Sequence, residues 1–469
     1  MSKVPLWPSI RTRPPITQRI FKGENKLDAF SIADEYVYDT VNLTSINFPA
    51  VSTRQGFSVA GTFGGRVLGM GVWKDTELHA VFNDGSWRKW NGSTWTTLIA
   101  SGLNTTAEWT FTNFKGNLSD ICLIGTNGVD SPRYYNGSSL AVLSGVPSGG
   151  KYITQFADRL WCAVGNELWA SAYRIADNWS LPTDPDDEDA SAWNVVIETP
   201  DGETINGIVS GLTRLTITKP SSTHSLIGYA PSDYDIRTNT LTTGQFNQKS
   251  AVTLDGWMYQ LDDAGFYRFP GSGQPENDFS ERIKWYFEKM SAADKAAAVL
   301  ASDNTRLYIG LGSVLVEYDP IRDTYYPWFG INALQFAQVG TQLYIGDAQG
   351  RVLQLGGTTD AGQPIPWRLI PKTFTAPSMA QRLVWLRLWS TVELPNGSTF
   401  GVSLNASASG GTWIQAGSIV TGNGSLHHDP IYFPSNILPV TQQIRTKFEG
   451  TGPMTLHEWA REQDILVQR

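Results

Sequence analysis

The chain has 469 residues, 12% of them aromatic, with 45 glycines and 25 prolines, which favours many short β-strands joined by tight turns in one large domain plus a small one. Its formal net charge of −8 argues against tight binding of nucleic acid, because such binding relies on clustered Lys and Arg. The N-terminus lacks an apolar signal-peptide core and no run approaches the ~18 apolar residues that span a bilayer, so we expect cytoplasmic synthesis and no membrane insertion.

The first segment, residues 1–40, is predicted to be an extended N-terminal arm. Its first 22 residues contain four prolines together with Lys3, Arg11, Arg13, Arg19 and Lys22, a composition that disfavours a helix. A frayed tail is one interpretation. The interpretation that we favour is an arm that lies on a neighbouring subunit and is ordered in the assembly.

Residues 41–365 repeat a unit of one short apolar strand, a turn rich in Asp, Gly or Asn, and a second strand rich in aromatic residues. Copies of this unit begin at His79, Ile121, Leu160, Leu215, Trp257, Leu307 and Leu343. The spacing is typical of a four-stranded propeller blade of roughly 40 to 50 residues. One small sheet cannot bury both of its faces alone, so we expect about seven blades to stack around an axis in a closed β-propeller.

Local patterns refine this prediction. In HAVFNDG, Ala80 and Phe82 should share one face of a strand while Val81 faces the next blade. The Asn-Gly pairs should supply the positive φ angles of hairpin turns. They occur at 91/92, 136/137, 396/397 and 423/424.

An acidic run, TDPDDEDAS, interrupts the repeats with Asp184, Asp186, Asp187, Glu188 and Asp189. It lacks the glycine and the distal glutamate of the familiar calcium-binding loop. We therefore predict a solvated insertion between blades, with calcium binding as the alternative.

A second insertion, near residues 280–302, has the one helical pattern of the chain. Ser280 is expected to cap a first turn, and Ile283, Phe287 and Met290 lie on one stripe. Ser291 can begin a second short helix with Asp294 at the third position, as in a capping box.

The blade pattern stops at about Pro366. Residues 381–394 and 399–405 are predicted to be long strands, and in the second of these Phe400, Val402 and Leu404 alternate with small residues. Residues 366–469 are therefore expected to form a C-terminal antiparallel β-sandwich. The predicted fold class is all-β, a propeller with this sandwich and one short helical insertion.

The sequence contains no nucleophile elbow, phosphate loop or zinc motif, and we predict no catalytic, cofactor-binding or metal-binding residues. His427, His428 and Asp429 are adjacent, and neighbours on an extended chain point to opposite sides. His79, His224 and His457 are isolated from any pattern of metal ligands.

Some propellers hydrolyse sugars with paired acids, so the carboxylate pairs need weighing. Asp262 with Asp263 is one candidate pair and Asp75 with Asp84 another. For the first pair the following sequence DAGFYR favours a hairpin turn over an active site.

Trp87, Trp90 and Trp95 could stack on a sugar ring as in lectins, but core packing explains them more simply. Cys122 and Cys162 lie in apolar runs and are expected to be buried thiols without a disulfide.

Three stretches of the chain resemble the β-propeller tail hub or nozzle proteins of short-tailed bacteriophages. The first is NLTSINFPAVSTRQGF at 42–57, similar to that family's Thr-Arg-x-Gly approach to the first blade. The second is the hairpin and helix start at 250–283. The third is the Trp-Arg and Gln-Arg-Leu sequence near 367–390, which leads into the C-terminal sandwich.

The resemblance implies a non-enzymatic virion protein of the phage tail, assembled in the host cytoplasm as a ring, with a hexamer expected. It implies partners, namely the adaptor or portal ring, tail fibres or tailspikes, and a plug or needle protein. Genomic DNA would pass through the lumen without specific binding, and no cofactor is implied. The alternative function is a receptor-binding or glycan-binding propeller of the adhesin or lectin kind.

Overall fold

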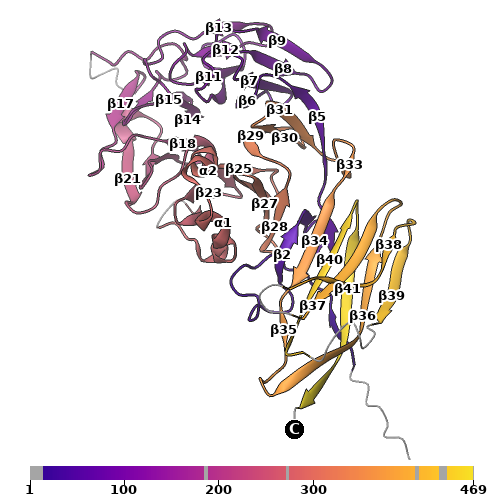
Figure 1. Ribbon diagram of the computed structural model, residues 1–469. Coiled ribbons are helices and arrows are strands. Elements are labelled where there is room, and N and C mark those ends of the chain that lie inside the picture. Colours follow the sequence, from indigo (N-terminus) through magenta and orange to yellow (C-terminus); the bar gives the residue numbers. More distant parts are fainter. Residues whose placement is uncertain (1–13, 184–188, 271–273, 407–410, 433–440, 468–469) are drawn as a thin grey trace, which may run out of the picture. The chain divides into compact units, whose positions relative to one another are not determined.

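The computed structural model describes residues 14–183, 189–270, 274–406, 411–432 and 441–467 (Figure 1). The chain divides into two compact units. Unit 1 contains Met1–Arg54 and Gln363–Arg469, so both ends of the chain contribute to it, and unit 2 is the intervening Gln55–Gly362. No helix in the described ranges is long and apolar enough to cross a membrane.

Unit 2 consists of small sheets that follow one another along the chain, seven of them in its described residues. The first three sheets contain β6 (Val67–Trp73), β7 (Glu77–Phe82), β8 (Trp87–Trp90) and β9 (Trp95–Ile99); β10 (Thr110–Phe114), β11 (Cys122–Thr126), β12 (Arg133–Tyr135) and β13 (Leu140–Val142); and β14 (Tyr152–Phe156), β15 (Arg159–Val164), β16 (Glu167–Ala170) and β17 (Trp193–Val196). The next three contain β18 (Gly207–Ser210), β19 (Leu215–Thr218), β20 (Thr223–Ile227) and β21 (Asp235–Thr240); β22 (Ala251–Leu254), β23 (Trp257–Asp262) and β24 (Gly265–Phe269); and β25 (Val299–Ser302), β26 (Leu307–Leu311), β27 (Val314–Asp319) and β28 (Thr324–Phe329). The last sheet contains β29 (Ala333–Val339), β30 (Gln342–Asp347) and β31 (Arg351–Leu355), joined by β5 (Phe57–Thr62) and β32 (Thr359–Asp360). The short strand β33 (Gln363–Pro364) follows where the chain returns to unit 1.

The first strands of these sheets contact one another around a closed circuit. β6 contacts β10, β10 contacts β14, and β14 contacts β18, which is next to the 3-10 turn η3 (Gln248–Ser250). The circuit continues from β22 through β25 and β29 back to β6. Unit 2 is therefore a β-propeller, and the prediction of an all-β propeller fold is confirmed.

The last sheet takes a strand from each end of unit 2. β5, at the start of the unit, pairs antiparallel with β31, at its end, with Phe57 opposite Leu355. Hydrogen bonds from Gly56 N to Gly357 O (2.9 Å) and from Gly356 N to Gly56 O (2.8 Å) continue this pairing. The ring is thus closed by hydrogen bonds between the two ends of unit 2.

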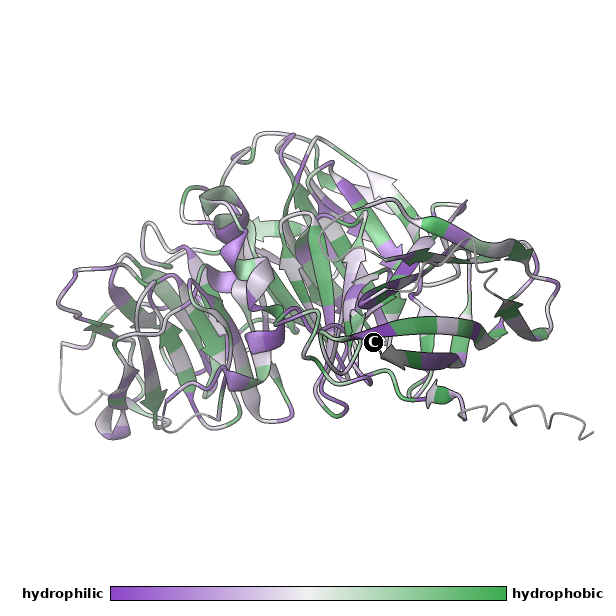
Figure 2. Cartoon of the chain, turned by 60° about the horizontal axis from the view of Figure 1, so that its bottom comes forward, coloured by the Kyte–Doolittle hydropathy of each residue, from purple (hydrophilic) through white to green (hydrophobic). Residues whose placement is uncertain are grey.

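Burial explains why apolar and polar residues alternate so weakly along the strands of unit 2. Every residue of β11 and β26 is buried, because the neighbouring sheets cover both faces. The predicted partition of β7 is confirmed: Ala80 and Phe82 pack in one apolar cluster and Val81 in another. Figure 2 shows many hydrophobic residues in the strands, with hydrophilic residues among them.

The helical insertion contains η4 (Asp278–Ile283), α1 (Lys284–Glu288) and α2 (Ala292–Ala297). The capping box is confirmed, since Ser291 Oγ accepts from Asp294 N and Asp294 Oδ2 accepts from Ser291 N. Ser280 is not a cap: it lies inside η4 and its hydroxyl donates to Phe266 O at 2.7 Å. The insertion also ends earlier than expected, because residues from Val299 onward form β25.

In its described residues, unit 1 consists of two antiparallel sheets with six strands each. The first contains β3 (Leu43–Thr44), β4 (Val51–Thr53), β41 (Thr455–Val467), β36 (Gln381–Glu393) and β39 (Leu426–Tyr432), with β1 (Ile16–Gln18) also paired to β41. The second contains β2 (Val37–Val41), β34 (Pro366–Pro371), β40 (Gln443–Thr451), β37 (Thr399–Asn405) and β38 (Ile414–Thr421), with β35 (Phe374–Thr375) paired to β40.

Aromatic rings from both sheets meet between them, with Phe448 of β40 and Trp459 of β41 at 5.5 Å between centroids. The predicted boundaries therefore change, because residues 16–53 supply β1 to β4 to unit 1. Within the expected arm over residues 1–40, β1 and the start of β2 instead pair with strands of unit 1. Residues 1–13 lie outside the described part of the chain.

Candidate functional site

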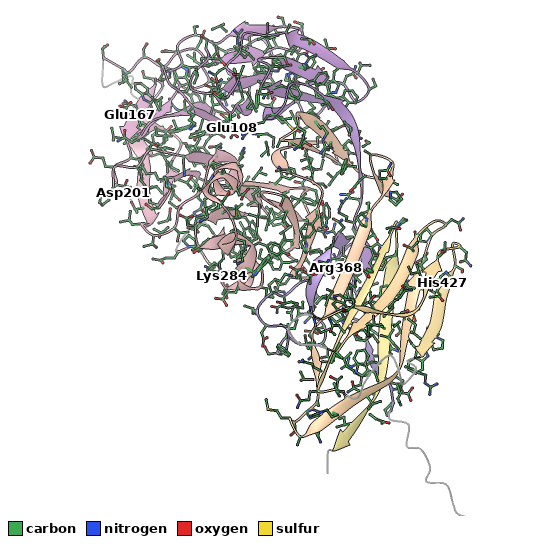
Figure 3. The ribbon with its side chains drawn as sticks, viewed as in Figure 1. Glu108, Glu167, Asp201, Lys284, Arg368 and His427 are labelled. Atoms are coloured by element: carbon green, nitrogen blue, oxygen red, sulfur yellow. The ribbon has the colours of Figure 1, made fainter. Side chains whose placement is uncertain are left out.

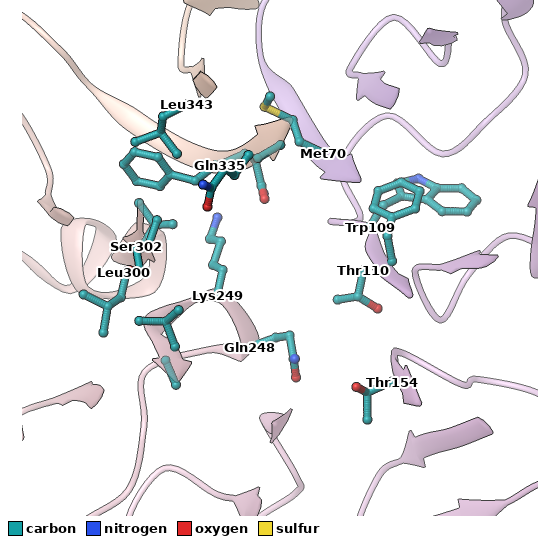
Figure 4. A pocket seen from close by; sticks show the side chains of 18 of the residues that line it. Met70, Trp109, Thr110, Thr154, Gln248, Lys249, Leu300, Ser302, Gln335 and Leu343 are labelled. Atoms are coloured by element: carbon teal, nitrogen blue, oxygen red, sulfur yellow. The ribbon is translucent and has the colours of Figure 1, made fainter. Parts of the chain in front are cut away.

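A concave surface with several polar side chains lies at the inner strands of the propeller. A recess of about 330 Å³ is lined from β6, β10, β14, β22, β25 and β29, and from η3 (Figure 4). Its lining combines apolar side chains with neutral hydrogen-bonding groups, including Thr110, Thr154, Ser302 and Gln335. Lys249 extends into it toward Gln335, and no Asp or Glu belongs to its lining.

A second recess of about 730 Å³ shares Trp109, Thr110, Gln248, Lys249 and Gln335 with the first. Loops that lead into the inner strands complete its wall. They are residues 106–108 before β10, 127–129 after β11, 149–151 before β14, and 204–206 before β18. We call this second recess the channel mouth.

Three charged groups meet at the channel mouth. Lys249 Nζ donates to Glu108 Oε1 at 2.8 Å, and Arg66 Nη2 donates to the same oxygen at 2.9 Å. Burial lowers the pKa of Lys249, and Glu108 opposes this change. Glu108 lies toward the middle of unit 2, whereas Asp201 and Lys284 lie near its margin (Figure 3).

The local fold fixes the position of Lys249. The side chain of its neighbour Gln248 accepts from Ile208 N at 2.7 Å and donates to Ile208 O at 2.9 Å. The Gln248 side chain thereby makes the two hydrogen bonds to β18 that a neighbouring strand would otherwise make. Asn247 caps η3 by accepting from Lys249 N at 3.0 Å, which holds the backbone from which the lysine side chain projects.

The paired acids do not converge. Burial raises the pKa of Asp262 to about 6, although N–H groups of Ala264, Gly244 and Gly265 bond to its carboxylate and work against that rise. Asp263 is instead exposed and forms an ion pair with Lys295 at 2.6 Å. Neither residue lines the recesses, and Asp262 serves the β23–β24 turn.

The other acids also belong to turns. Asp75 has a φ of 57° in the turn after β6, and Asp84 accepts from Ser86 N at 2.9 Å in the turn after β7. In the acidic run, Asp189 Oδ1 accepts from Ser232 N at 3.0 Å, whereas residues 184–188 lie outside the described residues. Calcium binding, the alternative prediction for the acidic run, therefore concerns residues whose structure is not described.

The histidines of β39 face different neighbours. His427 and His428 lie opposite Val392 and Thr391 of β36, and His428 Nδ1 is 2.7 Å from Thr391 Oγ1. Within the described ranges, no group of three His, Cys, Asp or Glu side chains is placed to hold a metal ion.

Two tryptophans of the first sheet, Trp87 and Trp90, are core residues. Trp87 is fully buried and donates from Nε1 to His79 Nδ1 at 3.0 Å. Trp95 donates from Nε1 to Ala60 O at 3.0 Å, and its ring lies 5.3 Å from that of Trp90, which is also buried. The core-packing interpretation is confirmed for Trp87 and Trp90, so neither offers a face to a sugar.

A buried polar cluster around His79 was missed by sequence reasoning. Glu77 contacts His79 Nε2 at 3.1 Å and Lys89 Nζ at 3.0 Å, and Lys89 also donates to Tyr135 Oη at 2.7 Å. The available signal was the Glu-x-His spacing, which puts both side chains on one face of a strand. Cys122 and Cys162 are free and buried as expected, and burial raises the pKa of Cys162 to about 12.

Comparison with known proteins found similarity to solved structures at low sequence identity. No protein-family model and no curated protein matches the chain. The WD40 β-propeller domain of Doa1 is 9% identical over 64% of this chain and 97% of that domain, with a TM-score of 0.42. BamB from Moraxella catarrhalis is 10% identical over 66% of this chain and 98% of that one, with a TM-score of 0.40. The structure of YCF48 bound to D1 peptide is 10% identical over 66% and 96%, also with a TM-score of 0.40.

Proposed function

We propose that the protein is a non-enzymatic structural component of a bacteriophage tail that assembles with copies of itself into a ring. The observation that carries this proposal is a pair of edge strands in unit 1. β38 ends one sheet and β39 ends the other, and each pairs with one strand in the described part of the chain. Isolated proteins protect such edges, because unpaired N–H and C=O groups recruit further strands.

The edge strand β38 lacks most of the usual protection, whereas β39 contains Asp429 and Pro430. β38 reads IQAGSIVT and contains neither a charged residue nor a proline. Ile419 of β38 and Leu426 of β39 are 57% and 58% exposed. An uncharged edge with exposed aliphatic side chains fits an assembly contact, and the occupant that we propose is a second copy of this chain.

The phage-tail setting is supported by the resemblance of three sequence stretches to tail hub or nozzle proteins. The Thr-Arg-x-Gly stretch coincides with the passage from unit 1 to unit 2, where buried Arg54 donates to Asn42 Oδ1 at 3.0 Å. A Cβ on Gly56 would lie 2.0 Å from Thr359 O, so the motif requires glycine there. The second stretch forms β22 to β24 and η4, and the third spans β34 to β36.

Assembly is tested on the purified full chain by size-exclusion chromatography with light scattering. We expect an oligomer, and we expect Ile419→Lys to shift it toward the monomer because a buried lysine opposes the contact. Leu212→Lys is the matched control, since Leu212 is 94% exposed in unit 2. A monomeric wild type, or an equal effect of the two substitutions, would contradict the proposal. Gold-labelled antibody on the parent particle tests the location in the tail.

A glycan-binding function is the second candidate, and one surface of unit 1 favours it. A recess of about 230 Å³ over β1, β36, β39 and β41 includes Trp389, His428 and Glu458. Arg19 Nε donates to Glu458 Oε2 at 2.6 Å, and Thr391 Oγ1 donates to Oε1 at 3.1 Å. An indole beside charged and hydroxyl groups is a combination that suits sugars.

A glycan array probed with the full chain separates the two functions. Binding that Trp389→Ala abolishes would favour the glycan-binding function. Trp285→Ala is the control, because Trp285 is an exposed tryptophan on α1 of unit 2. An array without bound glycans would remove this candidate.

A further inference from the structure

The channel mouth has a local charge opposite to that of the whole protein. Its lining contains Lys151, Lys249 and Glu108, and no other Asp or Glu. Arg66 adds a third cation through its bond to Glu108. The channel mouth therefore brings together one carboxylate and three cationic groups, in a chain whose formal net charge is −8.

The single carboxylate is shared by two cations. Arg66 and Lys249 both donate to Oε1 of Glu108, at 2.9 and 2.8 Å. A lysine ammonium group has three donor hydrogens. Glu108 is its hydrogen-bond partner in the described part of the chain, so two donors remain for another acceptor.

Burial makes this incomplete pairing costly. The Lys249 side chain is 13% exposed, and an ammonium group removed from water needs compensating acceptors. Water satisfies such a group in part, but an oxyanion does so with charge as well as hydrogen bonds. The volume of about 730 Å³ is within the range of small-ligand sites.

We propose that the channel mouth is a binding site for a small oxyanion, with Lys249 as the main contact and Lys151 at the rim. Glu108 acts as the internal competitor, because its carboxylate occupies the same two cations that the ligand would use. Carboxylate and phosphate groups share the chemistry that this site recognises. The inference does not depend on the proposed tail function, since it concerns unit 2 and not the edge strands.

The test uses the full chain with two probes at matched ionic strength. Phosphate binding is followed by ³¹P line broadening and succinate binding by saturation-transfer NMR. We expect Lys249→Gln to weaken binding at least about tenfold, because it removes a charge-assisted hydrogen bond. Lys284→Gln, at an exposed lysine of α1, should leave binding unchanged.

Glu108→Gln should change binding in the opposite direction. Removing the competing carboxylate releases Arg66 and Lys249, so affinity should rise several-fold, a result that a merely structural role for Glu108 would not give. Binding of one probe alone identifies the preferred anion. The proposal is overturned if neither probe binds the wild type at 10 mM (roughly the weakest affinity of interest), or if Lys249→Gln binds as the wild type does.

Discussion

At the scale of single residues, Glu77 in the first sheet of the propeller has a strongly lowered pKa. Burial alone would raise its pKa, but hydrogen bonds with His79 and Lys89 outweigh burial and lower the pKa to about 2. His79 accepts at Nδ1 from Trp87, so its Nε2–H is the atom that faces Glu77. The imidazole is therefore held in one neutral tautomer, and burial lowers its pKa.

These shifts predict an acid-dependent loss of stability. The folded pKa of Glu77 lies below its unfolded value, so its contribution is present above about pH 4.5 and is lost as the pH falls toward 2. The contribution is at most about 3 kcal/mol. Urea unfolding should show Glu77→Gln less stable than wild type at pH 7, with the gap shrinking by pH 3. A gap that is independent of pH would contradict this account.

At the scale of single residues, the sequence predicts correctly those conformations that depend on residues close in the sequence. Asn-Gly pairs were expected to supply positive φ, and Gly92 and Gly137 have φ of 96° and 97°. The asparagines contribute differently, because Asn91 Oδ1 accepts from Ser93 N and Thr94 N. Glu77 and Lys89 meet Tyr135 of the next sheet, and no local pattern contains that contact.

At the scale of elements, the approach of Gly56 to Thr359 predicts a steric effect at the start of the propeller. Gly56→Ala would place a Cβ 2.0 Å from the carbonyl oxygen of Thr359, which is backbone and cannot rotate away. We expect a loss of about 1–3 kcal/mol in the free energy of unfolding. Gly211→Ala is the control, because its nearest contact would be an ordinary 3.4 Å. Thermal unfolding of both variants measures the difference, and equal melting temperatures would refute the prediction.

The elements that sequence reasoning missed are those paired over long distances. β1 pairs with β41, where Thr17 lies opposite Ala460, and β4 also pairs with β41. The capping box of α2 was predictable because Ser291 and Asp294 are three residues apart. Ser280 was misassigned because its partner, Phe266 O, belongs to the preceding strand β24. The channel mouth was likewise unpredicted, since Arg66, Glu108 and Lys249 converge only after the ring closes.

At the scale of the whole molecule, the propeller depends on one strand pairing between its ends. Phe57 of β5 is buried in a cluster with Leu353 and Leu355 of β31, whereas Val59 of the same strand is exposed. Phe57→Ala should therefore cost about 3–5 kcal/mol, and Val59→Ala much less. The loss should spread beyond β5, because inner strands of neighbouring sheets pack against one another and an open ring exposes both β6 and β29.

Hydrogen exchange on the full chain detects that spread. In Phe57→Ala, amides of β29 to β31 and of β6 should lose protection together, while amides of β36 and β41 in unit 1 should keep theirs, because closure concerns unit 2. Val59→Ala should leave both sets unchanged. If exchange in Phe57→Ala increases in β5 alone, the strand is a local addition and the ring does not need it for closure. The stiffness that the proposed tail function requires would then have to come from the contacts between inner strands, and not from the pairing of the two ends.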